Sequence, residues 1–214
     1  MLTSRTATLA KELEELYQKR RADMPFHGWH HVYFVAKKAV QFAAEFDVDR
    51  ELVEAAALTH DLNYLVEVNS EPEIGKELRA QYLTSAGFST GAMNEIESLV
   101  MQEHTATRHG DISDAAKALS DADTLFKALP VTPIVFAGHF LTENHVDIRT
   151  LAAKIVREQR PLMNKGIYFY TTVAKEKYLR WANTNLKLWE NVLMALDDED
   201  VSEMLDIARG LKAL

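Results

Sequence analysis

The stretch LVEAAALTHDL, residues 52–62, joins a helical run of apolar residues to a histidine and an aspartate. His60 follows Ala56 by four residues and Asp61 follows Ala57 by four, so both side chains lie at positions that the pattern marks as buried. A buried aspartate is costly unless it pairs with a cation or coordinates a metal. The alternative is an ordinary helix end, where His60 interacts with the helix dipole and Asp61 is exposed in the following loop.

Apolar residues recur at three-to-four spacing outward from this stretch, and only 5 prolines and 8 glycines interrupt the chain. This pattern predicts an all-α fold. Asp49 and Ser113 are residue types favoured as N-caps. The expected helices cover residues 4–21, 29–46, from Asp49 to near 62, from after a loop through Pro72 to near 87, from 89 or 90 to about 104, and from Ser113 to before Pro130.

The later part of the chain carries an aromatic and aliphatic stripe, whose helical spacing is typical of core packing rather than of a cofactor site. No repeat or low-complexity linker divides the sequence, so we expect a single domain over residues 1–214, with a core at about 25–130 and further helices at about 131–214 packed on it. Contact of the stripe with a second subunit, in a homodimer, is the alternative. The stripe consists of Tyr178, Trp181, Ala182, Leu186, Trp189, Val192, Leu193 and Leu196.

The composition limits the partners and the kind of site. With 24 basic and 32 acidic residues the net charge is -8, which argues against binding of a nucleic-acid polymer. Because cysteine is absent, any metal must be held by His, Asp or Glu. No segment approaches the ~20 apolar residues of a membrane span, and residues 1–20 lack the apolar region of a signal peptide. We therefore expect a cytoplasmic protein that does not bind membranes.

Three of the eight histidines fall within residues 27–31. On a helix, His31 shares its face with apolar residues at positions 35, 39 and 42, whereas His30 shares its face mostly with polar residues. His31 is therefore the histidine expected to point inward. His27 lies four residues earlier, at the junction of loop and helix, where it can lean over the same spot.

Two aspartates, Asp121 and Asp123, flank the apolar face of a later predicted helix on opposite sides and at about equal angles. The helical pattern therefore does not choose between them. Together with His31, His60 and Asp61, one of these two carboxylates completes a set of ligands for one divalent metal ion.

An inward histidine, a His-Asp pair at the end of the next helix and an aspartate on a later helix together resemble the HD-domain superfamily of metal-dependent phosphohydrolases. The resemblance covers residues 25–130 well and residues 154–196 more weakly. It implies an HD-domain-like helical bundle with additional C-terminal helices, and it implies that His31, His60, Asp61 and Asp123 are the metal ligands. It rests on the motifs HGWHHV (27–32), LTHDL (58–62), IESLVMQEH (96–104) and ADTL (122–125).

The resemblance also implies roles beyond metal binding. His27 matches a histidine that in some relatives contacts the substrate or protonates the leaving group, His104 matches another site histidine, and Asp61 acts in catalysis as well as in metal binding. Relatives that act on deoxynucleoside monophosphates or guanosine alarmones often carry a glutamate where Tyr64 stands here, which disfavours those activities. Glu67, one turn later, is the candidate for orienting the attacking water.

Phosphate binding near an acidic site requires basic side chains, and proximity in sequence indicates Lys76, Arg79 and Arg108. Two-metal relatives usually add two histidines between the His-Asp pair and the last aspartate. Here His104 is accompanied only by His109, five residues later. We therefore expect one divalent ion, which could be Mn, Co, Ni, Mg, Fe or Zn.

The expected function is hydrolysis of a phosphoester or phosphoanhydride bond of a nucleotide or other small phosphorylated molecule by a metal-activated water. The alternatives are an iron oxygenase on the same scaffold, a non-catalytic nucleotide-binding or sensor protein, and a plain helical protein with chance histidines.

Overall fold

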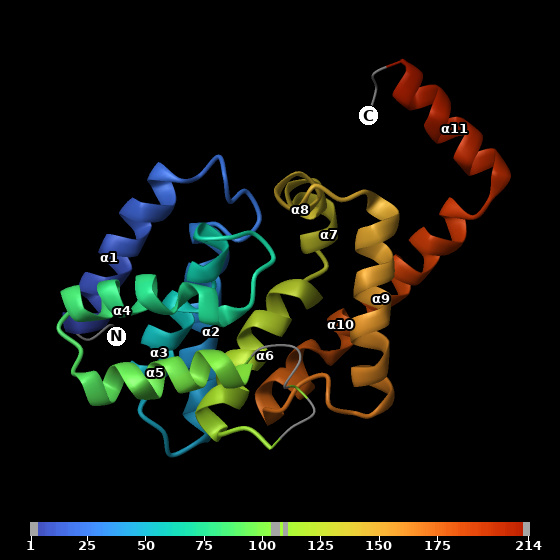
Figure 1. Ribbon diagram of the computed structural model, residues 1–214. Coiled ribbons are helices and arrows are strands. Elements are labelled where there is room, and N and C mark those ends of the chain that lie inside the picture. The colour runs from blue at the N-terminus through green and yellow to red at the C-terminus, as the bar shows by residue number, and fades with distance from the viewer. Residues whose placement is uncertain (1–3, 104–107, 109–110, 212–214) are drawn as a thin grey trace.

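The computed structural model describes residues 4–103, 108 and 111–211, and within these ranges the chain is helical and contains no strand (Figure 1). The predicted all-α fold is thereby confirmed. The first half consists of α1 (Ser4–Lys19), α2 (Trp29–Phe42), α3 (Arg50–Thr59), α4 (Lys76–Ser85), α5 (Thr90–Glu103) and α6 (Asp114–Ala128), with short 3-10 turns at Ala43–Glu45, Leu62–Leu65 and Pro72–Gly75.

The predicted caps begin the helices that they were expected to begin. The Asp49 carboxylate accepts from the backbone N–H of Glu51 at 2.9 Å, and Ser113 Oγ accepts from the backbone N–H of Ala116 at 3.3 Å. Two predicted ends lie too far along the chain. The second helix ends at Phe42 instead of 46, and the third ends at Thr59 instead of 62, because a 3-10 turn follows each of them closely.

Helix α2 lies at the centre of the first half and packs against α3 on one side and α6 on the other. Its inward residues Val32, Val35 and Ala39 are fully buried. Burial of each large aliphatic side chain contributes roughly 1.5 to 3 kcal/mol. This packing holds the inner face of α2, which carries His31, against the end of α3 and the second half of α6.

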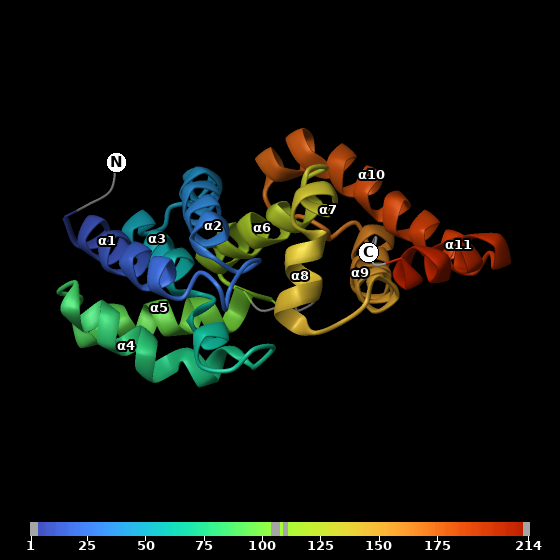
Figure 2. The ribbon, with the colours of Figure 1, turned by 90° about the horizontal axis from the view of Figure 1, so that it is seen from above.

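The second half consists of α7 (Thr132–Val135), α8 (Ala137–Asn144), α9 (Ile148–Asn164), α10 (Thr172–Leu196) and α11 (Glu199–Gly210). Figures 1 and 2 show α6 between this group and helices α1 to α5. Helix α10 packs on both α6 and α9, and Ala182, Leu186 and Trp189 of the predicted stripe are buried there. Helix α11 extends from the outer end of the molecule and buries none of its residues.

None of the helices in the described ranges combines the length and the apolar character needed to cross a membrane.

Candidate metal centre

The end of α3 supplies two side chains of the candidate centre, those of His60 and Asp61. Thr59 is the last helical residue, His60 forms the C-cap, and Asp61 leaves the helix with φ -97° and ψ 15°. The His60 side chain is buried, and that of Asp61 is 13% exposed. Asp61 thus faces the protein interior instead of lying exposed in a loop.

His31, His60 and Asp61 meet at three atoms. His31 Nε2 lies 3.0 Å from Asp61 Oδ2, His60 Nε2 lies 3.2 Å from the same oxygen, and the two Nε2 atoms are 3.2 Å apart. A divalent ion with ligand bonds of about 2.0 to 2.2 Å holds neighbouring ligand atoms about 3.0 to 3.5 Å apart. The three atoms therefore have the spacing that a metal ion requires.

The orientation of these groups also fits a metal ion. His60 Nδ1 lies 2.8 Å from the carbonyl oxygen of Ala57, and if it donates its proton there, Nε2 is left as a lone-pair donor. Asp61 Oδ2 is buried and lacks a hydrogen-bond partner in the described structure, although two imidazoles lie beside it. A cation placed between the two Nε2 atoms and Asp61 Oδ2 would give that oxygen a partner.

Asp121 and Asp123 have different surroundings. Asp123 Oδ1 lies 3.5 Å from His31 Nε2, so its carboxylate adjoins the three-atom group. Asp121 instead accepts hydrogen bonds from the backbone N–H groups of Tyr170 and Thr171 and from the Thr171 hydroxyl, and it pairs with Arg108 at 3.1 Å. The geometry therefore favours Asp123 as a ligand and gives Asp121 a structural role at the start of α10.

The electrostatics indicate a centre that attracts a cation. Burial lowers the pKa of His60, but the adjacent negative charge of Asp61 and the carboxylates around it outweigh burial and raise the pKa to about 9. Burial raises the pKa of Asp123, but Lys127, His31 and His60 together hold it below its usual range. The carboxylates thus stay ionised, and without a metal a proton on His60 balances part of their charge.

His27 lies beside this centre. Its Nδ1 pairs with the Glu143 carboxylate, which also accepts from the backbone N–H of Phe26 at 2.8 Å, and Tyr64 stacks on its ring at 3.9 Å. Gly28 is the N-cap of α2, and a Cβ there would lie 2.7 Å from the carbonyl oxygen of Met24. Glycine thus allows the tight turn that presents His27. Nothing in the sequence marked Glu143, which lies outside every motif.

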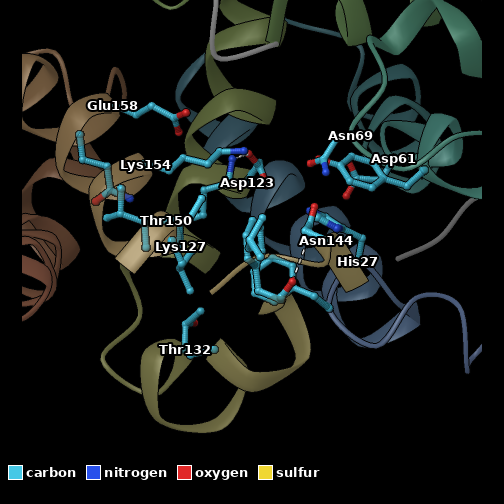
Figure 3. A pocket seen from close by; sticks show the side chains of 18 of the residues that line it. His27, Asp61, Asn69, Asp123, Lys127, Thr132, Asn144, Thr150, Lys154 and Glu158 are labelled. Atoms are coloured by element: carbon cyan, nitrogen blue, oxygen red, sulfur yellow. Dashed lines mark hydrogen bonds and ion pairs between the residues drawn. The ribbon is translucent and has the colours of Figure 1, made fainter. Parts of the chain in front are cut away.

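A cavity of about 690 Å³ opens onto the centre (Figure 3). His60, Asp61 and Asp123 form part of its wall, and His31 lies behind them with 1% of its surface exposed. The cavity lies between the two halves of the chain. Its opposite wall, from the C-terminal helices, includes Phe140, Asn144, Thr150, Leu151, Lys154, Ile155, Glu158, Asn185 and Trp189.

The two arginines predicted to bind phosphate have structural roles instead. Arg79 is fully buried and forms a bidentate pair with Glu97, with N–O distances of 2.7 and 3.1 Å. Arg108 is buried and bonds to Ser120, to Asp121 and to the carbonyl oxygen of Tyr168. Neither of them lines the cavity. Because the two arginines are paired in the interior and do not reach the cavity, they are not available to a substrate there.

Lys76 and Glu67 are exposed, and neither side chain lines the cavity. Glu67 lies on the turn that follows Leu62–Leu65, so the predicted role in orienting water is not supported by its position. His104, the other predicted catalytic residue, lies outside the described residues, as does His109.

Glu103, Lys127 and Lys154 are among the charged residues of the cavity wall that were not predicted. Glu103, the last residue of α5, is buried; burial and the charge of Asp123 raise its pKa to about 7 against the opposing effects of His60 and Lys127. Lys127 and Lys154 are the cavity's lysines. Lys127 follows Asp123 by one helical turn, a spacing that the sequence already contained.

Two comparisons relate the chain to known proteins. Residues 28–127 match the family model described as HD domain. The fold also resembles the crystal structure of Bacillus subtilis YpgQ in complex with ADP, with a TM-score of 0.61 and 20% identity over 92% of this chain and 99% of that one. No curated protein matches the chain.

Proposed function

Residues 28–127 of the chain form an HD domain, and from this we propose that the protein is a metal-dependent phosphohydrolase acting on a nucleotide or another small phosphorylated molecule. The observation that carries the proposal is the group formed by His31 Nε2, His60 Nε2 and Asp61 Oδ2. These atoms lie within 3.2 Å of one another at the wall of a cavity large enough for such a substrate.

We propose that His31, His60, Asp61 and Asp123 hold one divalent ion. Two imidazoles and two carboxylates suit Mn, Co, Ni, Fe or Zn, and Mg with less preference because it favours oxygen ligands. When bound, such an ion lowers the pKa of a coordinated water and offsets negative charge on phosphoryl oxygens. The two carboxylates neutralise its charge, and the contact between His60 Nδ1 and the Ala57 carbonyl orients one ligand.

His27 is the residue that we propose to contact the substrate or protonate the leaving group. Its Nδ1 is paired with Glu143, so Nε2 is the ring nitrogen free to reach a ligand in the cavity. Stacking against Tyr64 restricts rotation of the ring. A fixed acid close to the reacting group typically contributes 10²- to 10⁴-fold to the rate.

A nucleotide is the preferred substrate class. The structure of Bacillus subtilis YpgQ was determined in complex with ADP, and that protein shares the fold of this chain. Here the cavity adds aromatic and amide side chains from the C-terminal helices, including Phe140, Trp189 and Asn185. Such surfaces suit the flat base and the polar sugar of a nucleotide.

The proposal is tested with the purified full chain. Bound metal is quantified by elemental analysis, and nucleotides and phosphate esters are screened for phosphate or pyrophosphate release with added Mn, Co, Ni or Mg and with a chelator. Metal-dependent release that is lost in His60→Ala is the expected result. A chain that neither binds metal nor hydrolyses any compound would refute the proposal.

Two further outcomes separate the alternatives. Nucleotide binding without turnover under any metal identifies a binding or sensor protein. An iron absorption spectrum with oxygen consumption, and without phosphate release, identifies an oxygenase.

A further inference from the structure

We propose that Lys154 of α9 and Lys127 of α6 form an anion subsite that binds the phosphate groups of the substrate beside the metal centre. This inference rests on the function proposed above, because a phosphorylated substrate is what the subsite would receive. It adds a binding site contributed partly by the C-terminal helices, outside residues 28–127.

The first observation is that Lys154 is a half-buried cation without an anion. Its side chain lines the cavity, and among the residues that the structure describes no ion pair or hydrogen bond involves its ammonium group. Its nearest recorded partner is the ring of Phe140, with Nζ 5.7 Å from the ring centroid. Lysines in proteins usually extend a buried stem to water or to an opposite charge. Lys154 instead extends into a cavity.

The second observation is the direction of the side chain. In Figure 3, Lys154 points from α9 across the cavity toward Lys127 and Asp123. Leu151 and Ile155, which flank it on α9, make the surrounding wall apolar. A charge interaction in such surroundings is stronger than it would be in water. An anionic group in the cavity would therefore bind Lys154 at the end nearer to the metal centre.

Lys127 is the second member of the subsite, and its position is fixed. Its Nζ lies 2.6 Å from Asp123 Oδ2, while Asn185 Nδ2 of α10 donates to its carbonyl oxygen at 2.6 Å. Asp123 balances the charge of Lys127. Of the two lysines, Lys154 therefore carries the charge that remains for a ligand. In a chain of net charge -8, two lysines at the cavity offset part of the repulsion that a phosphate would meet.

Glu158 offers the competing explanation. It follows Lys154 by four residues on α9 and lines the same cavity, so the two side chains could form an ordinary exposed helix pair. No such pair lies within ion-pair distance among the described residues, where the Glu158 carboxylate instead pairs with Arg157 at 3.7 Å. The two explanations differ in what happens when Lys154 loses its charge.

The test uses Lys154→Met, which keeps the apolar stem, Lys154→Arg, which restores the charge, and Lys177→Met, which removes an exposed lysine of α10 outside the cavity. Binding of ADP and of inorganic phosphate is measured by calorimetry with and without Mn, after circular dichroism has established folding. We expect binding to Lys154→Met to weaken about tenfold with a smaller salt dependence, near recovery in Lys154→Arg, and no change in Lys177→Met.

The subsite would be overturned if Lys154→Met bound ADP and phosphate as tightly as the wild type does. Failure of both compounds to bind the wild type would also overturn it. The subsite and the proposed function fail in distinguishable ways. Lysine-dependent binding without turnover keeps the subsite and rejects the hydrolase, whereas turnover with an unchanged KM in Lys154→Met keeps the hydrolase and rejects the subsite.

Discussion

Glu143 holds His27 through both backbone and side chain: its carboxylate accepts from the backbone N–H of His27 at 3.1 Å and pairs with the imidazole, although 116 residues separate the two. The contact joins α8 to the loop that precedes α2. Both side chains are buried, so the pair is shielded from solvent. A residue of the C-terminal half thus positions a side chain of the candidate site.

This pair should make the protein sensitive to acid. Burial raises the pKa of Glu143, but the hydrogen bond and charge of His27 and two backbone N–H groups outweigh burial and lower it below the usual 4.5. A carboxyl with a lowered folded-state pKa adds stability above pH 4.5 that is lost as the pH falls through the folded value. We expect Glu143→Gln to lower the free energy of unfolding by about 1 to 3 kcal/mol at pH 6. Urea titrations from pH 7 to 3.5 should show this difference shrinking below pH 4.5; a constant difference would contradict the assignment.

Glu103 should have the opposite pH dependence. Its pKa is raised to about 7, first by burial and then by the charge of Asp123. The folded state therefore retains a proton that the unfolded state releases near pH 4.5, and this contribution to stability falls as the pH rises from 4.5 to 7. The free energy of unfolding of metal-free Glu103→Gln, taken relative to that of wild type, should rise by about 2 to 3 kcal/mol from pH 5 to pH 8. Urea unfolding of both proteins is measured in chelator at pH 5 and at pH 8. The prediction is refuted if the variant is more stable relative to wild type at pH 5 than at pH 8.

The two aspartates of α6 should respond differently to the same substitution. Asp123→Asn removes a proposed ligand, so we expect bound metal, measured by elemental analysis, to fall at least tenfold under limiting supply. Asp121→Asn should leave metal content unchanged and lower the free energy of unfolding by about 1 to 3 kcal/mol, because it weakens the bonds to Thr171 and Arg108. The assignment would be reversed if Asp121→Asn lost its bound metal while Asp123→Asn retained it.

Arg79 should matter for stability and not for ligand binding. Replacement by Met leaves the carboxylate of Glu97 without its bidentate partner and removes bonds to the carbonyl oxygens of Thr59 and Pro72. We expect Arg79→Met to cost about 3 kcal/mol in urea unfolding while ADP affinity stays at the wild-type value. Lys76→Met, at an exposed position three residues earlier, is the control and should change neither quantity. Weaker ADP binding in a stably folded Arg79→Met would restore the phosphate role.

The sequence predicted those features that depend on local periodicity. The apolar face shared with Val35 and Ala39 indicated that His31 points inward, and it is 1% exposed. Asp49 and Ser113, as N-cap residues, located the starts of α3 and α6. Each of these inferences uses positions within a few residues of one another, and such short-range relations survive folding.

Features that depend on contacts between distant segments were not predictable in the same way. Helical geometry left Asp121 and Asp123 equivalent, and their difference comes from Tyr170 and Thr171, about fifty residues later. Arg79 was expected at the substrate because it lies near the motifs in sequence, but Glu97 holds it in the core. Lys154 was not predicted as a site residue because α9 carries no motif that indicates the site.

Glu67 provides the sharpest comparison between sequence and structure. The family resemblance made it the candidate for orienting the attacking water, yet its side chain is exposed and does not line the cavity, where Glu103 does. With the substrate found in the metal-dependent screen, Glu67→Gln should keep kcat within about twofold of wild type, as expected for an exposed substitution. Glu103→Gln should change kcat or its pH profile, because a buried carboxyl beside the ligands alters the charge of the centre. A tenfold loss of kcat confined to Glu67→Gln would show that the turn after Asp61 closes over the substrate and brings Glu67 to the water.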